Sequence, residues 1–132
     1  MPQLTPILAA LALSATATAA SAEMKLAFDW GNIPRCTTGR PNVVPSPTFT
    51  LSGVPAGVTA LTFRLKDRDV PGYNHGGGTV KVKMPAKGTI PAGAFSYKSP
   101  CPPSGRHLYE WTVTAKAGNQ TLATAKAQRS YP

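Results

Sequence analysis

Proline and glycine divide this chain into short segments. The 132 residues include 14 prolines and 12 glycines, which interrupt regular structure at short intervals and are typical of tight loops. Between them, several segments alternate polar and apolar residues, the period of a strand with one buried face. Helix signals are weak. The pattern predicts an all-β domain, a sandwich or Greek-key barrel with little helix.

The clearest alternation runs over residues 61–67, where Leu61, Phe63 and Leu65 share one face. Residues 31–47 are typical of a loop, and residues 117–120 of a hairpin turn. The alanines of the last segment also suit a helix, so its assignment as a strand is open. Six strands are predicted, over residues 25–30, 48–52, 61–67, 79–84, 108–115 and 121–129.

The N-terminal segment has the features of a signal peptide. An apolar run over residues 7–13 is followed by small residues and by Ala20-Ser21-Ala22, and no lysine or arginine precedes residue 23. The run is too short to span a bilayer. We predict a signal peptide over residues 1–22, a single domain over residues 23–132, and a periplasmic or secreted location.

The two cysteines, Cys36 and Cys101, are candidates for a disulfide bond. Exported proteins occupy compartments in which disulfides form and persist. A bridge over a loop of this length would stabilise the fold by roughly 4 kcal/mol in the loop-entropy description. The alternative is a reactive thiol at Cys101, beside Arg106 and His107, which would lower its pKa.

The formal charge of +9 lies entirely after residue 22. It favours an anionic partner or surface. Nucleic acid is not expected, because the chain has neither an aromatic-basic RNA signature nor zinc-finger spacing. Peripheral contact with an anionic envelope surface fits the charge, and so does a basic face that is simply solvated.

Two short segments, residues 67–75 and 100–109, carry nearly all the side chains capable of site chemistry. The period of two places Asp67 on the inward face of its strand, and it places His107 in line with Tyr109 on another. Polar side chains at the end of an inward-facing apolar row of a strand can line a pocket at the rim of a sandwich. Alternatively they are buried there and form hydrogen bonds with each other, as His107 would with Asp67. For Asp69, hydrogen bonding within the loop is at least as good an explanation as ligand contact.

These two segments resemble the signatures of the phosphatidylethanolamine-binding proteins and their bacterial, Raf-kinase-inhibitor-like relatives. The first signature, Asp-Pro-Asp-x-Pro followed by a histidine, is matched by residues 67–71 and His75. The second, Gly-Pro-x-Pro-Pro-x-Gly-x-His-x-Tyr, is matched by residues 99–109 with serine in place of the first glycine. The chain departs from the pattern at Arg68, which replaces a proline, and at residues 76–78, a triple glycine that we expect to be a flexible turn. It looks like a short exported member.

The resemblance implies a β-sandwich with a small pocket for an anionic head group such as phosphate or phosphoethanolamine. It implies that Val70–Pro71 is a cis peptide bond, which gives Pro71 a structural role, as the predicted bridge gives Cys36 and Cys101. The residues that it places in the pocket are Asp67, His75, Pro102, His107 and Tyr109.

We therefore expect a non-catalytic protein that binds a small anion or a phospholipid head group, without cofactor or metal, as a monomer. The alternative is an envelope protein-interaction or protease-inhibitor module that uses the same rim loops. Catalysis or metal binding by Asp67, Asp69, His75 and His107 is a third hypothesis. It has less support, because no nucleophile motif and no metal-ligand spacing is present.

Overall fold

The structure is a computed structural model that describes residues 2–3, 9–14 and 23–132. The signal peptide predicted over residues 1–22 falls largely outside these residues and stays a prediction. Within the described part of the chain, no helix has the length and apolar character needed to cross a membrane.

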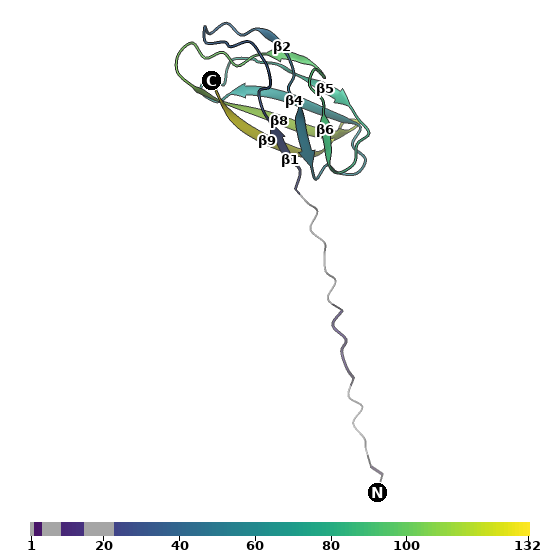
Figure 1. Cartoon of the computed structure of the whole chain (residues 1–132). Coiled ribbons are helices and arrows are strands. Elements are labelled where there is room, and N and C mark those ends of the chain that lie inside the picture. The colour runs from purple at the N-terminus through teal and green to yellow at the C-terminus, as the bar shows by residue number, and fades with distance from the viewer. Residues whose placement is uncertain (1, 4–8, 15–22) are drawn as a thin grey trace.

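The described residues form nine strands and no helix, so the prediction of an all-β fold is confirmed (Figure 1). The largest sheet has the order β5-β4-β8-β9, a second has the order β1-β3-β6, and β2 pairs with β7. The strands are β1 (Lys25–Phe28), β2 (Val43–Pro45), β3 (Phe49–Ser52), β4 (Ala60–Asp67), β5 (Gly77–Lys81), β6 (Gly88–Ile90), β7 (Ser96–Lys98), β8 (His107–Ala117) and β9 (Gln120–Tyr131).

The four-stranded sheet is antiparallel throughout, and β4 pairs with β8 over its whole length, from Ala60 to Asp67. The segment that also suited a helix is strand β9, the hairpin partner of β8. Packing explains why its alanines prefer the strand: Ala127 lies opposite Trp111, and Ala125 lies opposite Val113. Small residues at these positions leave room for the bulky inward side chains of the neighbouring strand.

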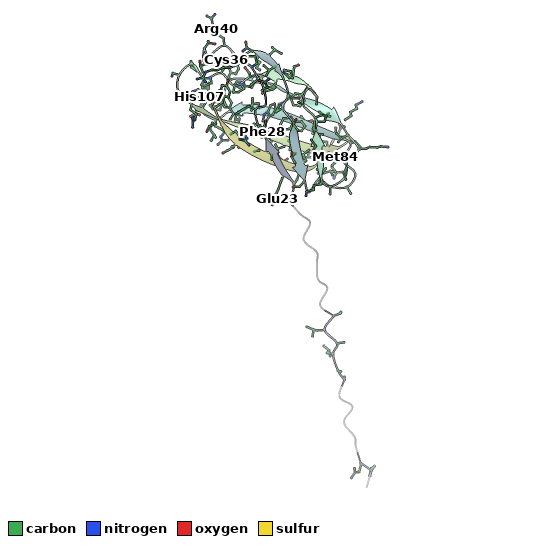
Figure 2. All side chains as sticks on the ribbon, in the orientation of Figure 1. Glu23, Phe28, Cys36, Arg40, Met84 and His107 are labelled. Carbon is green, nitrogen blue, oxygen red and sulfur yellow. A yellow bond between two sulfur atoms is a disulfide. The ribbon has the colours of Figure 1, made fainter. Side chains whose placement is uncertain are left out.

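The core lies between the inward faces of the large sheet and the β1-β3-β6 sheet, which Figure 2 shows with all described side chains. Phe49 of β3 stacks on Phe63 of β4 with ring centroids 4.3 Å apart. Trp111 of β8 meets Phe49 edge-on at 5.2 Å. Leu61 and Phe63 are completely buried, as their alternation predicted. Aromatic packing therefore joins the two layers.

The three short strands β2, β6 and β7 do not appear among the predicted strands. Residues 31–47, predicted as a loop, contain β2, which pairs with β7 more than 50 residues further along the chain. A three-residue strand is too short to show alternation, and its pairing partner is distant in sequence. Strand β5 also ends at Lys81, before the predicted end at residue 84.

The two cysteines form the predicted disulfide bond, with their Cα atoms 4.6 Å apart. Both Cys36 and Cys101 are buried. The alternative of a reactive thiol at Cys101 is wrong, because neither cysteine is free.

Truncation of the central aromatic side chain tests this core. We expect Phe63→Ala to lower the free energy of unfolding by about 3–5 kcal/mol, because it removes a fully buried ring and leaves a cavity. Urea unfolding followed by tryptophan fluorescence measures the change. Arg64→Ala, on the exposed face of the same strand, is the control and should change stability by no more than about 0.5 kcal/mol. Equal losses in the two variants would contradict the assignment of the buried face.

Candidate functional site

The residues expected to bind a ligand lie at the end of the sandwich where β4 ends and β8 begins. A cavity of about 400 Å³ opens there, a volume in the range of small-molecule sites. Three loops and the ends of two strands form its walls. The side chains come from the β1–β2 loop (Thr38, Gly39, Arg40, Pro41), the end of β4 and the loop after it (Asp67, Val70, Tyr73, His75), the β7–β8 loop (Cys101, Pro103) and β8 (His107, Tyr109).

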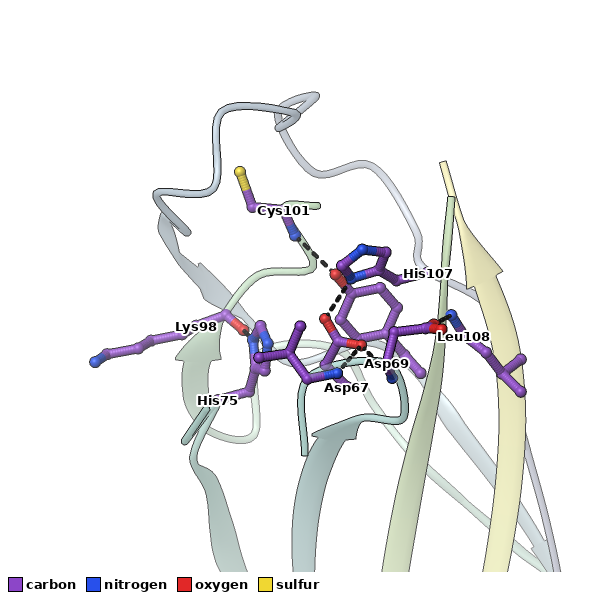
Figure 3. A network of polar contacts seen from close by, with 9 residues as sticks. Asp67, Asp69, His75, Lys98, Cys101, His107 and Leu108 are labelled. Carbon is purple, nitrogen blue, oxygen red and sulfur yellow. Dashed lines mark hydrogen bonds and ion pairs between the residues drawn. The ribbon is translucent and has the colours of Figure 1, made fainter. Parts of the chain in front are cut away.

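Asp67 connects the end of β4 to the start of β8 (Figure 3). Its Oδ2 atom lies 2.7 Å from Nδ1 of His107. Its Oδ1 atom accepts hydrogen bonds from the backbone amides of Asp69, at 2.9 Å, and Val70, at 3.2 Å. Asp69 adds a second link, because its Oδ2 atom accepts a hydrogen bond of 2.8 Å from the amide of Leu108. Both oxygens of Asp67 are thus engaged in holding the site together.

These contacts determine how Asp67 titrates. Burial by itself raises the pKa of the carboxyl group, but the hydrogen bonds from His107 and from the two backbone amides favour the charged form. The balance holds the pKa of Asp67 below its usual value of 3.8. The group is therefore a carboxylate at neutral pH.

Both histidines of the cavity use Nδ1 to contact the protein. His107 faces the Asp67 carboxylate, and Nδ1 of His75 lies 2.8 Å from the backbone carbonyl of Lys98. Because each partner can only accept, Nδ1 carries the proton in both rings, and Nε2 of each neutral ring is an acceptor. Burial lowers the pKa of His75, against an opposing effect of its bond to the Lys98 carbonyl.

Tyr109 forms the inner wall of the cavity and is almost fully buried. Its hydroxyl oxygen accepts a hydrogen bond of 3.2 Å from the amide of Cys101, and its ring meets His75 edge-on at 5.5 Å. Burial, reinforced by the nearby charge of Asp67, raises the pKa of Tyr109. The phenol therefore stays neutral and serves as a hydrogen-bonding wall.

Arg40 is the cation of the cavity lining, and sequence reasoning did not select it. It lies in the β1–β2 loop, which the Cys36–Cys101 disulfide attaches to the β7–β8 loop. The amide of Thr38 also donates a hydrogen bond of 3.3 Å to Sγ of Cys101. The sequence offered one clue to Arg40: it stands between a glycine and a proline, four residues after Cys36. This clue points to the cavity only when it is known which two loops the disulfide joins.

The structure brings together four of the five residues expected in the pocket, namely Asp67, His75, His107 and Tyr109. The fifth, Pro102, is fully buried and does not line the cavity. The neighbouring Pro103 is exposed and takes its place in the wall.

The expectation of a cis bond between Val70 and Pro71 is wrong, because the cis peptide bond in the described residues is Tyr131–Pro132. The amide of Tyr73 donates a hydrogen bond of 3.1 Å to the carbonyl of Val70. This bond closes a four-residue turn with Pro71 at its second position. A trans proline suits that position, whereas a cis proline belongs at the third.

The departures from the signatures also have structural explanations. Arg68 points away from the cavity and lies 3.6 Å from Oε1 of Glu110 on the outer face of the sheet. Gly77 and Gly78 belong to strand β5, so the prediction of a flexible turn is wrong for them. A Cβ atom on Gly78 would lie 2.6 Å from the ring of Phe95. The glycines permit the close approach of β5 to its neighbours.

Asp67, Asp69 and His107 each place one potential ligand atom within 4.8 Å of the others. Such a group could in principle hold a metal ion. Here the carboxylate oxygens already accept the backbone and imidazole hydrogen bonds described above. The hydrogen bonds therefore account for the clustering of these three side chains, because they hold the loop after β4 against the start of β8.

Two solved structures are similar to this one. A putative phosphatidylethanolamine-binding protein homologue from Chlamydia trachomatis has a TM-score of 0.54 and 18% identity, over 83% of this chain and 97% of its own. An Escherichia coli protein described as a new member of the mammalian family of phosphatidylethanolamine-binding proteins has a TM-score of 0.58 and 17% identity, over 83% of this chain and 98% of its own. The chain has the fold of the phosphatidylethanolamine-binding proteins.

This phosphatidylethanolamine-binding-protein fold is recognised through structure, since no protein-family model and no curated protein matches the sequence. The similarity extends over nearly the whole of both solved chains. The fold predicted from the two signatures is therefore confirmed, although the identities are low. What the cavity binds is a separate question, to be argued from its residues.

The hydrogen bonds of Asp67 predict a pH dependence of stability. Because its pKa is lowered in the folded state, its contribution is present above about pH 4, near the pKa of the unfolded group, and is lost as the pH falls through the folded value. We expect Asp67→Asn to reduce stability at neutral pH and to flatten this acid-side decline. Urea unfolding between pH 2 and pH 7 measures it. The same decline in both proteins would contradict the assignment.

Proposed function

We propose that the cavity binds a small anion, such as phosphate or the phosphorylated head group of a phospholipid, without catalysing a reaction. The observation that carries this proposal is the chemistry of the lining. The two histidines line the cavity and the exposed Arg40 lies at its rim, while the one carboxylate among the lining residues, Asp67, already accepts three hydrogen bonds. Both oxygens of Asp67 are thus engaged with donors of the protein, and the basic side chains of the lining can contact a ligand.

The fixed orientation of the imidazoles supports this use. With Nδ1 of His75 and His107 held by protein acceptors, Nε2 of a protonated ring donates to an anion. Nε2 of a neutral ring accepts from a protonated phosphate or an ammonium group. A head group with both a phosphate and an amine could use either state.

The remaining walls suit the organic part of such a ligand. Val70 and Tyr73 contribute apolar surface to the lining, and they are 45% and 37% exposed, respectively. The two similar structures support the proposal further, since both are described as phosphatidylethanolamine-binding-protein homologues. The fold thus agrees with the chemistry of the lining, which remains the main support.

The proposal includes a periplasmic or secreted location for a monomer that needs no cofactor. It rests on the signal-peptide pattern of residues 1–22 and on the disulfide between Cys36 and Cys101. Disulfides persist in such oxidising compartments.

Calorimetric titration with phosphate and phosphoethanolamine tests the site. We expect His107→Ala and Arg40→Ala each to weaken binding by about 10- to 100-fold, the loss that corresponds to one charge-assisted hydrogen bond. Arg106→Ala is the matched control, because it removes an equal charge next to His107 from a side chain that does not line the cavity.

Absence of wild-type binding at millimolar ligand would contradict the proposal. It would move the search to the alternative function, a protein-interaction or protease-inhibitor module. The exposed Val70 and Tyr73 at the rim are the observation in favour of that alternative.

The histidines predict that anion binding strengthens as the pH falls. Since burial lowers the pKa of His75 from its usual 6.5, its charged form appears only below that value, and an anion then gains a donor and a positive charge. Sulfate is the best probe, because it remains a dianion over this range, whereas a phosphomonoester titrates near about pH 6. Titrations at pH 5 and pH 8 measure the effect. Equal sulfate affinities at the two values would show that the imidazoles do not contact the anion.

A further inference from the structure

Basic side chains that are far apart in the sequence lie together on the outer face of the large sheet. Strands β4 and β8 run antiparallel in regular register, so alternate residues of each lie on the face opposite the core. Six basic side chains lie there and represent every strand of the sheet. We call this set the basic face: Arg64, Lys66 and Arg68 on or next to β4, Lys81 on β5, Lys116 on β8 and Lys126 on β9.

Glu110 is the one acidic residue on this face. It is buried to 6% exposure, lies 3.6 Å from Arg68 and 3.9 Å from Lys126, and accepts a hydrogen bond of 2.8 Å from Gln128. Two of the other acidic residues lie at the border of this face: Glu23 lines a surface cavity with Lys126, and Asp69 accepts a hydrogen bond from the amide of Leu108. The basic face thus carries a formal charge of about +5, more than half of the net charge of the protein.

Threonines occupy the surface between the cations. One row across the sheet consists of Thr79, Thr62, Thr114 and Thr124, each directly opposite the next. The hydroxyls of Thr62 and Thr79 are 3.2 Å apart. These side chains are short, and they can donate and accept hydrogen bonds beside the charges.

We propose that the basic face docks on the surface of a membrane rich in anionic lipid. Clusters of about four to eight lysines and arginines are attracted to such surfaces. The cations spread over all four strands, from Lys81 at one edge to Lys126 at the other. The head groups of an anionic membrane form a planar array of negative charge, which can contact cations over the whole width of the sheet. Bases of single-stranded nucleic acid bind by stacking on aromatic side chains, and the outward positions of these strands carry none.

This inference goes beyond the proposed anion site and does not depend on it. The two features nevertheless meet at the end of β4, where Asp67 faces the cavity and Arg68 faces Glu110 outside. A protein lying on its basic face would hold the mouth of the cavity beside the lipid surface.

Co-sedimentation with vesicles tests the proposal. The probes are vesicles of equal parts phosphatidylglycerol and phosphatidylcholine, and vesicles of phosphatidylcholine alone, at low salt. We expect the wild-type domain, residues 23–132 with its disulfide intact, to bind the first and not the second. Raising the salt concentration should release it, because exposed charges are then screened.

The decisive variant is Arg64→Glu with Lys81→Glu, which reverses two charges of the basic face. Lys66 is left unchanged because it lies opposite Glu110, where a second carboxylate would be destabilising. The matched control is Arg35→Glu with Lys87→Glu, which changes the net charge equally at exposed positions that belong to neither the basic face nor the cavity lining. We expect at least a tenfold loss of vesicle affinity in the first variant and less than a threefold loss in the second, with unchanged circular dichroism in both.

Two outcomes would overturn the proposal. Equal losses in the two variants would mean that net charge alone attracts the protein to the vesicles. Tighter binding to duplex DNA than to the vesicles at the same salt concentration would identify a different partner. His107→Ala should leave vesicle binding intact, and Arg64→Glu with Lys81→Glu should leave phosphate binding intact, so the two sites can fail separately.

Discussion

The antiparallel pairing of β4 with β8 is the constraint on which both the core and the candidate site depend. It places Asp67 directly opposite Tyr109 and next to His107, so the same register that buries Phe63 and Trp111 also delivers the polar side chains to one end of the sheet. A shift of one residue would exchange the two faces of β4 and dismantle core and site together. Stability and site geometry therefore have a common origin here.

The other walls of the cavity are less tightly determined by strand pairing. The loop that carries Arg40 is held by the disulfide to Cys101 and by the short β2–β7 pairing. The disulfide is valuable to a domain this small, because it limits the conformations of the unfolded chain. It also places an arginine at the rim of the cavity that the two histidines line. One covalent bond thus contributes to stability and to the electrostatics of the site.

The strand period also separates two kinds of chemistry on a single sheet. Inward positions of β4 carry the apolar core and end in Asp67, while outward positions carry Arg64, Lys66 and Arg68. The buried Glu110, held between cations and Gln128, is the one interruption of the positive face. Neighbouring residues at the end of the strand thus belong to different proposed functions, a small-anion site and a lipid-facing surface.

Local pattern by itself determined a large part of this protein. Alternation over residues 61–67 and 108–115 identified the two central strands and their buried faces, and the signatures around Asp67 and His107 identified the fold and four of the residues that line the cavity. Tertiary structure decided what depended on distant partners: the short strands β2, β6 and β7, the place of Arg40 in the cavity, Pro103 in place of Pro102, and the trans bond at Pro71. The physical reason is one of range, because alternation and turn chemistry act between neighbouring residues. The walls of the cavity and the basic face form only when segments far apart in the sequence pair.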